Sequence, residues 1–358
     1  MKICVLGTRG FPLIQGGVEK HCESLYTEFP AEYRFVIFRR KPYVRVTPSY
    51  PNITFIDLPS TKIKGFEAVY HSFLSTCRAV LSRPDIVHIH NALFSPLLKL
   101  CGIKVVLTYH SPNYEHKKWG WGVRTLLKWS EKIALRMSDA VIFVNKFQLE
   151  KYDERTRSKS YYIPNGIPRI TPATQQNYIR ELGLTPGKYV LGVGRITPEK
   201  GFDCLEKAFA GVDTDYKLVI AGGVETESAY LDELKSILPP EKIVFTGYVY
   251  GEKLNQLYTH AGLYVLSSYN EGFPLVLLEA MSYGLDVLVS DIPASHLVDL
   301  PADDYFSKGD YEELARKIER KLKYPRQQKY ELEAYDWTAI VKRLAAVYDK
   351  LNGRKQVP

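Results

Sequence analysis

Two glutamates stand eight positions apart in the apolar stretch SYNEGFPLVLLEAMSYG, residues 268–284. Glu271 lies beside a Gly-Phe-Pro turn, whereas Glu279 lies inside the apolar run, which is typical of a buried helix. An ionised carboxylate in such a helix costs several kcal/mol unless groups donate hydrogen bonds to it. The vicinal diol of a ligand ribose would supply two such donors. Contact with solvent or with a neighbouring arginine is the alternative interpretation of Glu279.

A basic pair lies in a second segment, VGRITPEKGFD, residues 193–203. Arg195 ends a predicted strand, Lys200 follows five residues later, and Gly201 opens the next predicted helix. Two cations at a strand-to-helix junction suit a diphosphate, whose negative charge grows when it departs as a leaving group. This segment therefore predicts part of a site for a phosphorylated ligand.

The third segment, LGTRGFPLIQGGVEKH at residues 6–21, is a strand end, a loop and a helix that begins near Val18. Gly16 and Gly17 leave room for the backbone to approach a ligand closely. One function to consider for the chain is that of an NADP-dependent oxidoreductase. Arg39 and Arg40 end the second predicted strand, where such an enzyme would bind the 2′-phosphate of NADP. The loop does not have the G-x-G-x-x-G spacing, however, and that alternative gives the second half of the chain no role.

These segments are positioned by short apolar runs that alternate with amphipathic stretches, a pattern that predicts α/β domains with parallel sheets. The expected strands are 2–7, 33–39, 85–91, 103–110 and 139–145 in one series and 189–195, 216–223, 242–249, 263–268 and 286–291 in the other. A proline-rich linker at 161–174 separates the series. We expect an N-terminal domain at 1–166, a C-terminal domain at 167–335, and a final helix and tail at 336–358 that pack back on the N-terminal domain.

In open parallel sheets, ligands bind beyond the carboxyl ends of the strands. This rule places Arg195 and Glu271 at one edge of the second sheet, next to a helix N-terminus near Pro274 that favours a phosphate. It also places His90 and His110 at strand ends of the first sheet. By the same rule, Asp213-Thr214-Asp215 precedes a strand and lies at the wrong edge for a metal-binding D-x-D motif, so no metal is expected.

The charge of this 358-residue chain is uneven. Residues 1–168 hold 25 Lys and Arg against 13 Asp and Glu, so the net charge of +8 comes entirely from the first half. Basic and aromatic residues mix in FRRKPYVRVTPSY and YEHKKWGWGVRTLLKW, which predicts contact with an anionic membrane surface, with no nucleic acid partner. A solvated basic face without any partner is the alternative. The cations and indoles of the second stretch are Lys117, Lys118, Trp119, Trp121, Arg124, Lys128 and Trp129.

The five cysteines form no C-x-x-C pair, so neither a disulfide framework nor a cysteine zinc site is expected. The N-terminal apolar run is too short for a signal peptide, and no run reaches the roughly 18 residues of a membrane span. We therefore expect a cytoplasmic protein, peripheral on the inner face of the plasma membrane.

Together, the glycine loop, VGRITPEKG, LVIAGG, FTGYV and the two glutamates resemble the retaining glycosyltransferases of family 4, which have the GT-B fold of two Rossmann-like domains facing across a cleft. The opening segment is similar to a bacterial rhamnosyltransferase-like subgroup. The resemblance implies that a sugar moves from a nucleoside-diphosphate sugar to an acceptor hydroxyl in cell-surface polysaccharide or glycoconjugate synthesis, with a lipid-linked oligosaccharide as acceptor and no cofactor. A non-catalytic nucleotide-sugar-binding protein is the remaining alternative.

The resemblance also implies roles for individual residues. Glu279 would bind the ribose hydroxyls, and Arg195 with Lys200 would bind the diphosphate. No residue suggests a nucleophile, so the departing phosphate is expected to accept the acceptor's proton. The groups expected near the transferred sugar and the phosphates are Glu271, Gly272, Phe273, Pro274, Leu275, His110, Gly16 and Gly17.

Overall fold

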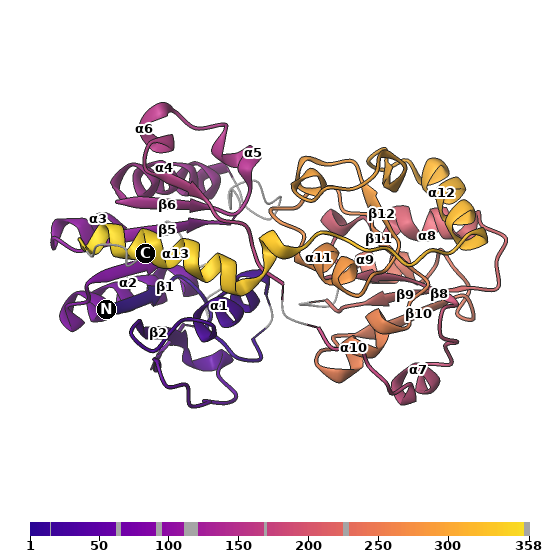
Figure 1. Cartoon of the computed structure of the whole chain (residues 1–358), viewed down its shortest axis with the longest axis horizontal. Coiled ribbons are helices and arrows are strands. Elements are labelled where there is room, and N and C mark those ends of the chain that lie inside the picture. The colour runs from indigo at the N-terminus through magenta and orange to yellow at the C-terminus, as the bar shows by residue number, and fades with distance from the viewer. Residues whose placement is uncertain are drawn as a thin grey trace. The chain divides into compact units, whose positions relative to one another are not determined.

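The chain divides into two compact units. The computed structural model describes residues 1–14, 16–61, 66–90, 95–110, 121–167, 170–224 and 229–353. Unit 1 comprises Met1–Gly166 and Glu333–Pro358, and unit 2 comprises Ile167–Leu332. Figure 1 shows a parallel sheet in each. The sequence placed the corresponding boundaries at 166/167 and 335/336.

Unit 1 is built on a seven-stranded sheet in which all neighbouring strands run parallel. Its order is β3-β2-β1-β4-β5-β6-β7. The strands are β1 (Lys2–Leu6), β2 (Arg34–Arg40), β3 (Ile53–Leu58), β4 (Ile86–Ile89), β5 (Lys104–Tyr109), β6 (Ala140–Phe143) and β7 (Ser160–Tyr162). Strands such as β4 and β6 are buried on both faces, which explains their continuous apolar sequences.

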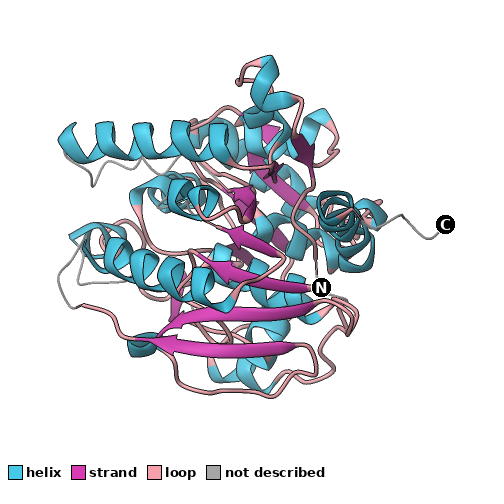
Figure 2. Cartoon of the chain, turned by 90° about the vertical axis from the view of Figure 1, so that its left-hand side faces the viewer, coloured by secondary structure: helices cyan, strands magenta, loops and turns pink. Residues whose placement is uncertain are grey.

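Helices cover both faces of this sheet (Figure 2). One core joins β1 and β2 to α1 and to the C-terminal helix α13, and the other joins the opposite face to α2, α3 and α4. The helices are α1 (Gly17–Thr27), α2 (Phe66–Ser82), α3 (Ser95–Leu100), α4 (Trp121–Met137), α5 (Lys146–Leu149), α6 (Glu154–Arg157) and α13 (Trp337–Asn352). None of the helices within the described ranges is long and apolar enough to cross a membrane.

Unit 2 has a six-stranded parallel sheet of order β10-β9-β8-β11-β12-β13. Its strands are β8 (Tyr189–Val193), β9 (Lys217–Ala221), β10 (Ile243–Gly247), β11 (Leu263–Leu266), β12 (Val287–Ser290) and β13 (Tyr305–Phe306). Its helices are α7 (Asn177–Glu181), α8 (Phe202–Ala210), α9 (Ala229–Leu234), α10 (Glu252–Thr259), α11 (Leu275–Ser282) and α12 (Tyr311–Lys323). Helices α8, α9 and α12 pack on one face of the sheet.

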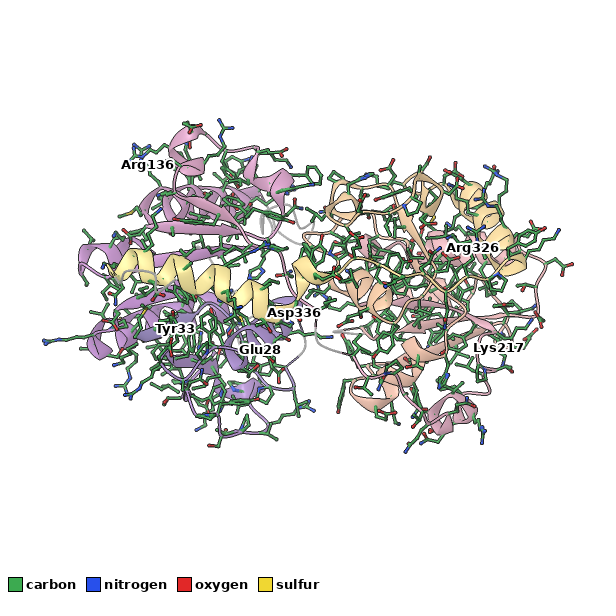
Figure 3. All side chains as sticks on the ribbon, viewed as in Figure 1. Glu28, Tyr33, Arg136, Lys217, Arg326 and Asp336 are labelled. Carbon is green, nitrogen blue, oxygen red and sulfur yellow. The ribbon has the colours of Figure 1, made fainter. Side chains whose placement is uncertain are left out.

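Helix α13 returns the chain to unit 1. Asp336, which is labelled in Figure 3, caps it by accepting a hydrogen bond from the Thr338 backbone N–H at 2.8 Å. Tyr33, which directly precedes β2, donates a hydrogen bond of 2.8 Å to the Asp349 carboxylate of this helix. At the start of the helix, Trp337 is buried against Gly166, where a Cβ atom would meet the indole ring at 2.5 Å.

Each sheet reverses its strand order at one point, and this reversal opens a crevice at the carboxyl ends of the two strands involved. The reversal lies between β1 and β4 in unit 1 and between β8 and β11 in unit 2. The predicted site residues follow these strands: the glycine loop follows β1, His90 follows β4, Lys200 follows β8 and Glu271 follows β11. The topology therefore places two candidate half-sites, one in each unit.

Candidate functional site

The half-site of unit 2 is organised around an ion pair between the two strands at the reversal. Lys200 Nζ lies 2.5 Å from Glu271 Oε1, and both side chains are largely buried. Ser268 Oγ donates to the same carboxylate oxygen at 2.7 Å. Among the described residues none donates a hydrogen bond to the second oxygen of Glu271, so this oxygen can accept an additional donor. The structure thus brings together two residues that lie 71 positions apart in the sequence.

Backbone constraints fix Lys200 in this position. It ends a short 3-10 helix, Pro198–Lys200, and Gly201 terminates that helix in the left-handed region at φ 63°. A Cβ at Gly201 would lie 2.1 Å from the backbone oxygen of Ser267. Ser267 Oγ also donates to the Lys200 carbonyl at 3.0 Å. The loops after β8 and β11 are therefore in close contact, which only glycine permits.

Helix α11 begins directly after Glu271 and its turn. Its N-cap residue is Pro274, and no side chain caps the helix, so backbone N–H groups of its first turn are not satisfied by a capping side chain. Gly272, Phe273, Pro274 and Leu275 form this approach to the helix. A helix N-terminus of this kind favours an anion.

Glu279 lies on α11 and is only 6% exposed. Tyr258 of α10 donates to its Oε2 at 3.1 Å, and the Tyr258 ring stacks on Tyr283 with centroids 5.2 Å apart. Burial, with the Glu279 charge adding to it, raises the pKa of Tyr258 well above 10, so the phenol remains a donor. The sequence did not identify Tyr258 as this partner. Arg195, at the end of β8, is exposed.

In unit 1, the glycine loop surrounds a buried carboxylate. Gly16 has φ 146°, and a Cβ there would lie 1.9 Å from Glu19 Oε2. Glu19 Oε1 accepts a hydrogen bond from the backbone N–H of Arg9 at 3.1 Å. Gly17 starts α1, and a Cβ there would meet nothing within 4 Å. The loop therefore requires glycine at Gly16 for both φ and space, whereas Gly17 leaves the start of α1 open.

Four histidine rings gather at the carboxyl ends of β4 and β5. His90 Nδ1 and His110 Nε2 are 3.0 Å apart, and Tyr26 Oη lies 2.7 Å from His90 Nε2. Tyr26 also contacts His88 Nδ1 at 3.0 Å, and His88 Nε2 contacts Thr108 Oγ1 at 2.7 Å. His88 is therefore a buried, hydrogen-bonded core histidine.

The fourth ring of the group, His21 of α1, was not identified from the sequence. Burial lowers the pKa of His21 to about 4, an effect that the neighbouring Asn165 side chain partly offsets. Burial lowers the pKa values of His90 and His110 well below 6.5, and the surrounding imidazoles add to this effect. All three rings are therefore neutral at pH 7.

The two arginines considered above for binding a 2′-phosphate, Arg39 and Arg40, already contact carboxylates of the protein. Arg39 is 1% exposed and binds Asp57 at 2.7 and 3.0 Å through two guanidinium nitrogens. Arg40 binds Glu67 at 3.3 Å. Arg39 is therefore not left to recognise a phosphate, and Arg40 is buried, which argues against the oxidoreductase alternative. Asp213 and Asp215 precede β9, as predicted, and Asp215 pairs with Lys188 at an exposed position.

Two models of known protein families together match nearly the whole chain. The sequence model described as Glycosyltransferase Family 4 matches residues 15–169, and the model described as Glycosyl transferases group 1 matches residues 174–337. Mannosylfructose-phosphate synthase of Agrobacterium fabrum is 32% identical over 45% of this chain and 39% of its own length. Sulfoquinovosyl transferase SQD2 of Arabidopsis thaliana is 26% identical over 73% of this chain and 56% of its own length. The matched region thus spans less than two thirds of either relative.

Solved structures share the fold. Sucrose-phosphate synthase from Thermosynechococcus elongatus has a TM-score of 0.80 at 22% identity and covers 98% of this chain and 99% of its own. Anabaena HepE in complex with UDP-glucose has a TM-score of 0.76 at 17% identity and covers 98% of this chain and 100% of its own. The predicted architecture of two parallel-sheet domains is confirmed.

Proposed function

Since the chain is a glycosyltransferase of family 4 with the GT-B fold, we propose that it transfers a sugar from a nucleoside-diphosphate sugar to an acceptor hydroxyl with retention of configuration. The observation that carries this proposal is the Lys200–Glu271 pair beside the N-terminus of α11. A cation, an uncapped helix end and a carboxylate with one oxygen available are complementary to a sugar diphosphate. HepE, a structural neighbour, is described in complex with UDP-glucose, which supports a donor of this class.

In the proposed reaction, the bond between the anomeric carbon and the diphosphate oxygen breaks, and the acceptor oxygen bonds to that carbon. Lys200, Arg195 and the start of α11 stabilise the charge that develops on the diphosphate. Glu271 accepts a hydrogen bond from a sugar hydroxyl, and Glu279 binds the ribose. The acceptor's proton goes to the departing phosphate. Within unit 1, His110 is the residue proposed for the transferred sugar, and His90, whose Nδ1 lies 3.0 Å from His110 Nε2, is the candidate for the acceptor side.

We further propose that turnover requires no metal, because cationic side chains supply the charge stabilisation. The test is release of free nucleotide from a panel of nucleotide sugars, with and without a chelator, together with NMR assignment of the product's anomeric configuration. Activity with one donor, retention, and no loss of activity with the chelator are expected. Loss of activity with chelator that Mg²⁺ or Mn²⁺ restores would contradict metal independence, and binding without turnover would favour the non-catalytic alternative.

The acceptor is proposed to be lipid-linked, in the synthesis of a cell-surface polysaccharide or glycoconjugate. Among the described residues, support for this proposal comes from α4, on which the Trp121 side chain is 85% exposed and the Trp129 side chain is 60% exposed. Arg124 and Lys128 lie on the same helix and are exposed. Indoles beside cations suit an anionic lipid surface. Lys117, Lys118 and Trp119, on which the prediction also rested, lie outside the described residues.

A further inference from the structure

Three imidazoles converge at one point in unit 1. One ring nitrogen each of His21, His90 and His110 lie within 4.8 Å of one another. The ring centroids are 5.0 Å apart for His21 and His110, 5.3 Å for His90 and His110, and 5.8 Å for His21 and His90. Three imidazoles that bind one tetrahedral Zn²⁺ at about 2.0–2.1 Å have centroids roughly 5 Å apart, so the rings already have nearly this spacing.

His21 is the unusual member of this cluster. It is 4% exposed, and within the described part of the chain neither ring nitrogen makes a hydrogen bond of standard length and angle; the side chain of Asn165 is the polar neighbour that acts on its pKa. A buried polar group without a partner costs about 1–3 kcal/mol, so such a group calls for an explanation. A metal ligand is one of the few roles that a neutral, buried imidazole can have.

The other two rings have the surroundings of metal ligands. Tyr26 Oη lies 2.7 Å from His90 Nε2 and can accept its N–H, which leaves the lone pair of His90 Nδ1 directed at His110. Metal-binding histidines almost always donate their other N–H to such an acceptor. The 3.0 Å between His90 Nδ1 and His110 Nε2 is a hydrogen bond in the metal-free protein, and an ion that replaces it would need these nitrogens only slightly farther apart, at about 3.3 Å. His21 has to move inward by about 1–1.5 Å to complete the set.

We propose that His21, His90 and His110 form a binding site for Zn²⁺ or a similar first-row divalent metal, with a fourth position open to water. Imidazole nitrogens suit Zn²⁺ rather than Mg²⁺ or Mn²⁺, so this site differs in kind from a diphosphate-binding metal. His110 is half-buried, whereas the other two rings are buried, so the ion reaches the site past His110.

The site has a regulatory consequence, which rests on the proposed function. Zn²⁺ takes the lone pair of His110 Nε2, which lies in the half-site of unit 1, and therefore inhibits transfer. In the metal-free protein His110 Nε2 carries the N–H that His90 Nδ1 accepts, so His110 moves this proton to its outer nitrogen when it binds the metal, and no net proton is released. A chelator then relieves inhibition by zinc in an enzyme that needs no metal for turnover.

The test uses the full chain without a histidine tag, freed of metal by dialysis. Co²⁺ is added, and the visible absorption of four-coordinate cobalt is recorded. Zn²⁺ per chain is measured after gel filtration, and zinc affinity is obtained by competition with a chelating dye. The variants are His21→Phe, which keeps an aromatic ring in the space, and Tyr26→Phe, which removes the acceptor for His90. His71→Phe is the matched control, since His71 is fully buried and its ring nitrogens likewise have no partner within the described residues.

The expected result is one metal per wild-type chain with a tetrahedral cobalt spectrum. His21→Phe weakens zinc binding by more than about 100-fold, Tyr26→Phe weakens it by about 10- to 100-fold, and His71→Phe does not change it. Absence of the spectrum in the wild type, its persistence in His21→Phe, or an equal loss in His71→Phe overturns the site. Should His21→Phe lose its circular dichroism signal, His21→Gln replaces it under the same criteria.

Inhibition is measured separately, as nucleotide release with and without one equivalent of Zn²⁺. Wild type and His71→Phe are expected to be inhibited, whereas His21→Phe is resistant. A cobalt spectrum in a protein that releases no nucleotide from any donor leaves the metal site standing and contradicts the proposed function. Full activity of the zinc-loaded wild type overturns the regulatory consequence.

Discussion

Lys200 and Glu271 neutralise each other in the ligand-free protein, and a bound diphosphate competes for the lysine. Ser268, which donates to Glu271, keeps the carboxylate in place when that happens. The pair therefore holds the lysine ready without leaving either charge buried alone, a state that would be costly.

The first prediction concerns this lysine. Lys200→Ala should lower kcat by about 100- to 1,000-fold and change donor affinity much less, because the charge that Lys200 meets is larger in the transition state. Steady-state kinetics and calorimetric donor binding measure the two effects. Lys207→Ala is the control, since Lys207 is a half-exposed lysine on α8 of the same unit. A Lys200→Ala enzyme with wild-type kcat would remove Lys200 from the site.

The second prediction concerns Glu279. Glu279→Gln should weaken donor binding by about 10- to 100-fold, because hydrogen bonds to a charged group contribute about 1.5–3 kcal/mol. Glu206→Gln, a change at another buried glutamate of unit 2, should not alter donor affinity. If both variants bind the donor as wild type does, Glu279 serves only as the partner of Tyr258.

At the residue scale, the sequence indicates the residues that follow strands and Glu279 on α11, but it does not single out His21 or Tyr258. Glu271 and Lys200 could be placed together because the carboxyl ends of parallel strands meet at one edge. His21 and Tyr258 lie on α1 and α10, and their roles depend on how each helix is rotated against its sheet. The signal available for His21 was its position four residues after Gly17, on the helix that follows the glycine loop.

At the scale of elements, the alternating pattern predicts the central strands of both sheets, because apolar strands and amphipathic helices are local signals. It misses β3, β7 and β13, and β7 overlaps the segment 161–174 that was predicted to be a linker. The partner of the final helix is a tertiary property. Helix α13 follows the last element of unit 2 in sequence but packs with α1 in the core of unit 1. What selects that partner is a contact between residues far apart in the chain, Gly166 and Trp337.

The third prediction tests this contact. Gly166→Ala places a methyl group 2.5–2.8 Å from three ring carbons of Trp337, so the helix or the linker must shift. Such overpacking costs about 1–3 kcal/mol, which corresponds to a Tm lower by roughly 3–10 °C. Gly122→Ala in α4 is the control, because its Cβ would meet nothing within 4 Å. Differential scanning calorimetry measures the Tm of both variants. Equal Tm values for Gly166→Ala and Gly122→Ala would contradict the packing role of Gly166.

The fourth prediction concerns α8 and its buried Glu206. The side chain is fully buried, neither oxygen has a partner within the described residues, and burial, with the Asp203 charge adding to it, raises the pKa of Glu206 to about 8. The folded pKa lies above the unfolded value of about 4.3, so the stability that Glu206 contributes is complete below about pH 4 and is lost as pH rises to about 8.

Glu206→Gln removes the ionisable carboxyl group, and with it the loss of stability between about pH 4 and about pH 8 that Glu206 causes. The difference in Tm, variant minus wild type, should grow by about 5 °C or more between pH 5 and pH 8.5. The difference between two proteins cancels the titration of all other groups, so melting curves at several pH values are sufficient. A difference that stays constant, or that shrinks toward pH 8.5, would show that Glu206 is ionised in the folded protein at neutral pH.

At the scale of the whole molecule, the two units carry opposite charge. The segments Met1–Gly166 and Glu333–Pro358 hold 30 Lys and Arg against 16 Asp and Glu, whereas Ile167–Leu332 holds 18 against 24. The return of α13 to unit 1 thus makes the asymmetry larger than a division by sequence halves indicates. Only unit 1 is suited to an anionic surface, and it is also the unit proposed to receive the acceptor.

The fifth prediction follows from this asymmetry and from the exposed indoles of α4. Each Lys or Arg near an anionic leaflet contributes about 1 kcal/mol, so four or five should give attachment that high salt reverses. Co-sedimentation should show binding to anionic vesicles and none to neutral ones. Trp121→Ser with Trp129→Ser, and Lys117→Glu with Lys118→Glu, should each reduce binding by at least about tenfold. The control Tyr324→Ser changes an exposed aromatic residue of the acidic unit and should have no effect. Equal binding to both vesicle types, or binding to neither, would contradict this prediction, because the basic face would then not select anionic lipid. A water-soluble acceptor would explain that result better.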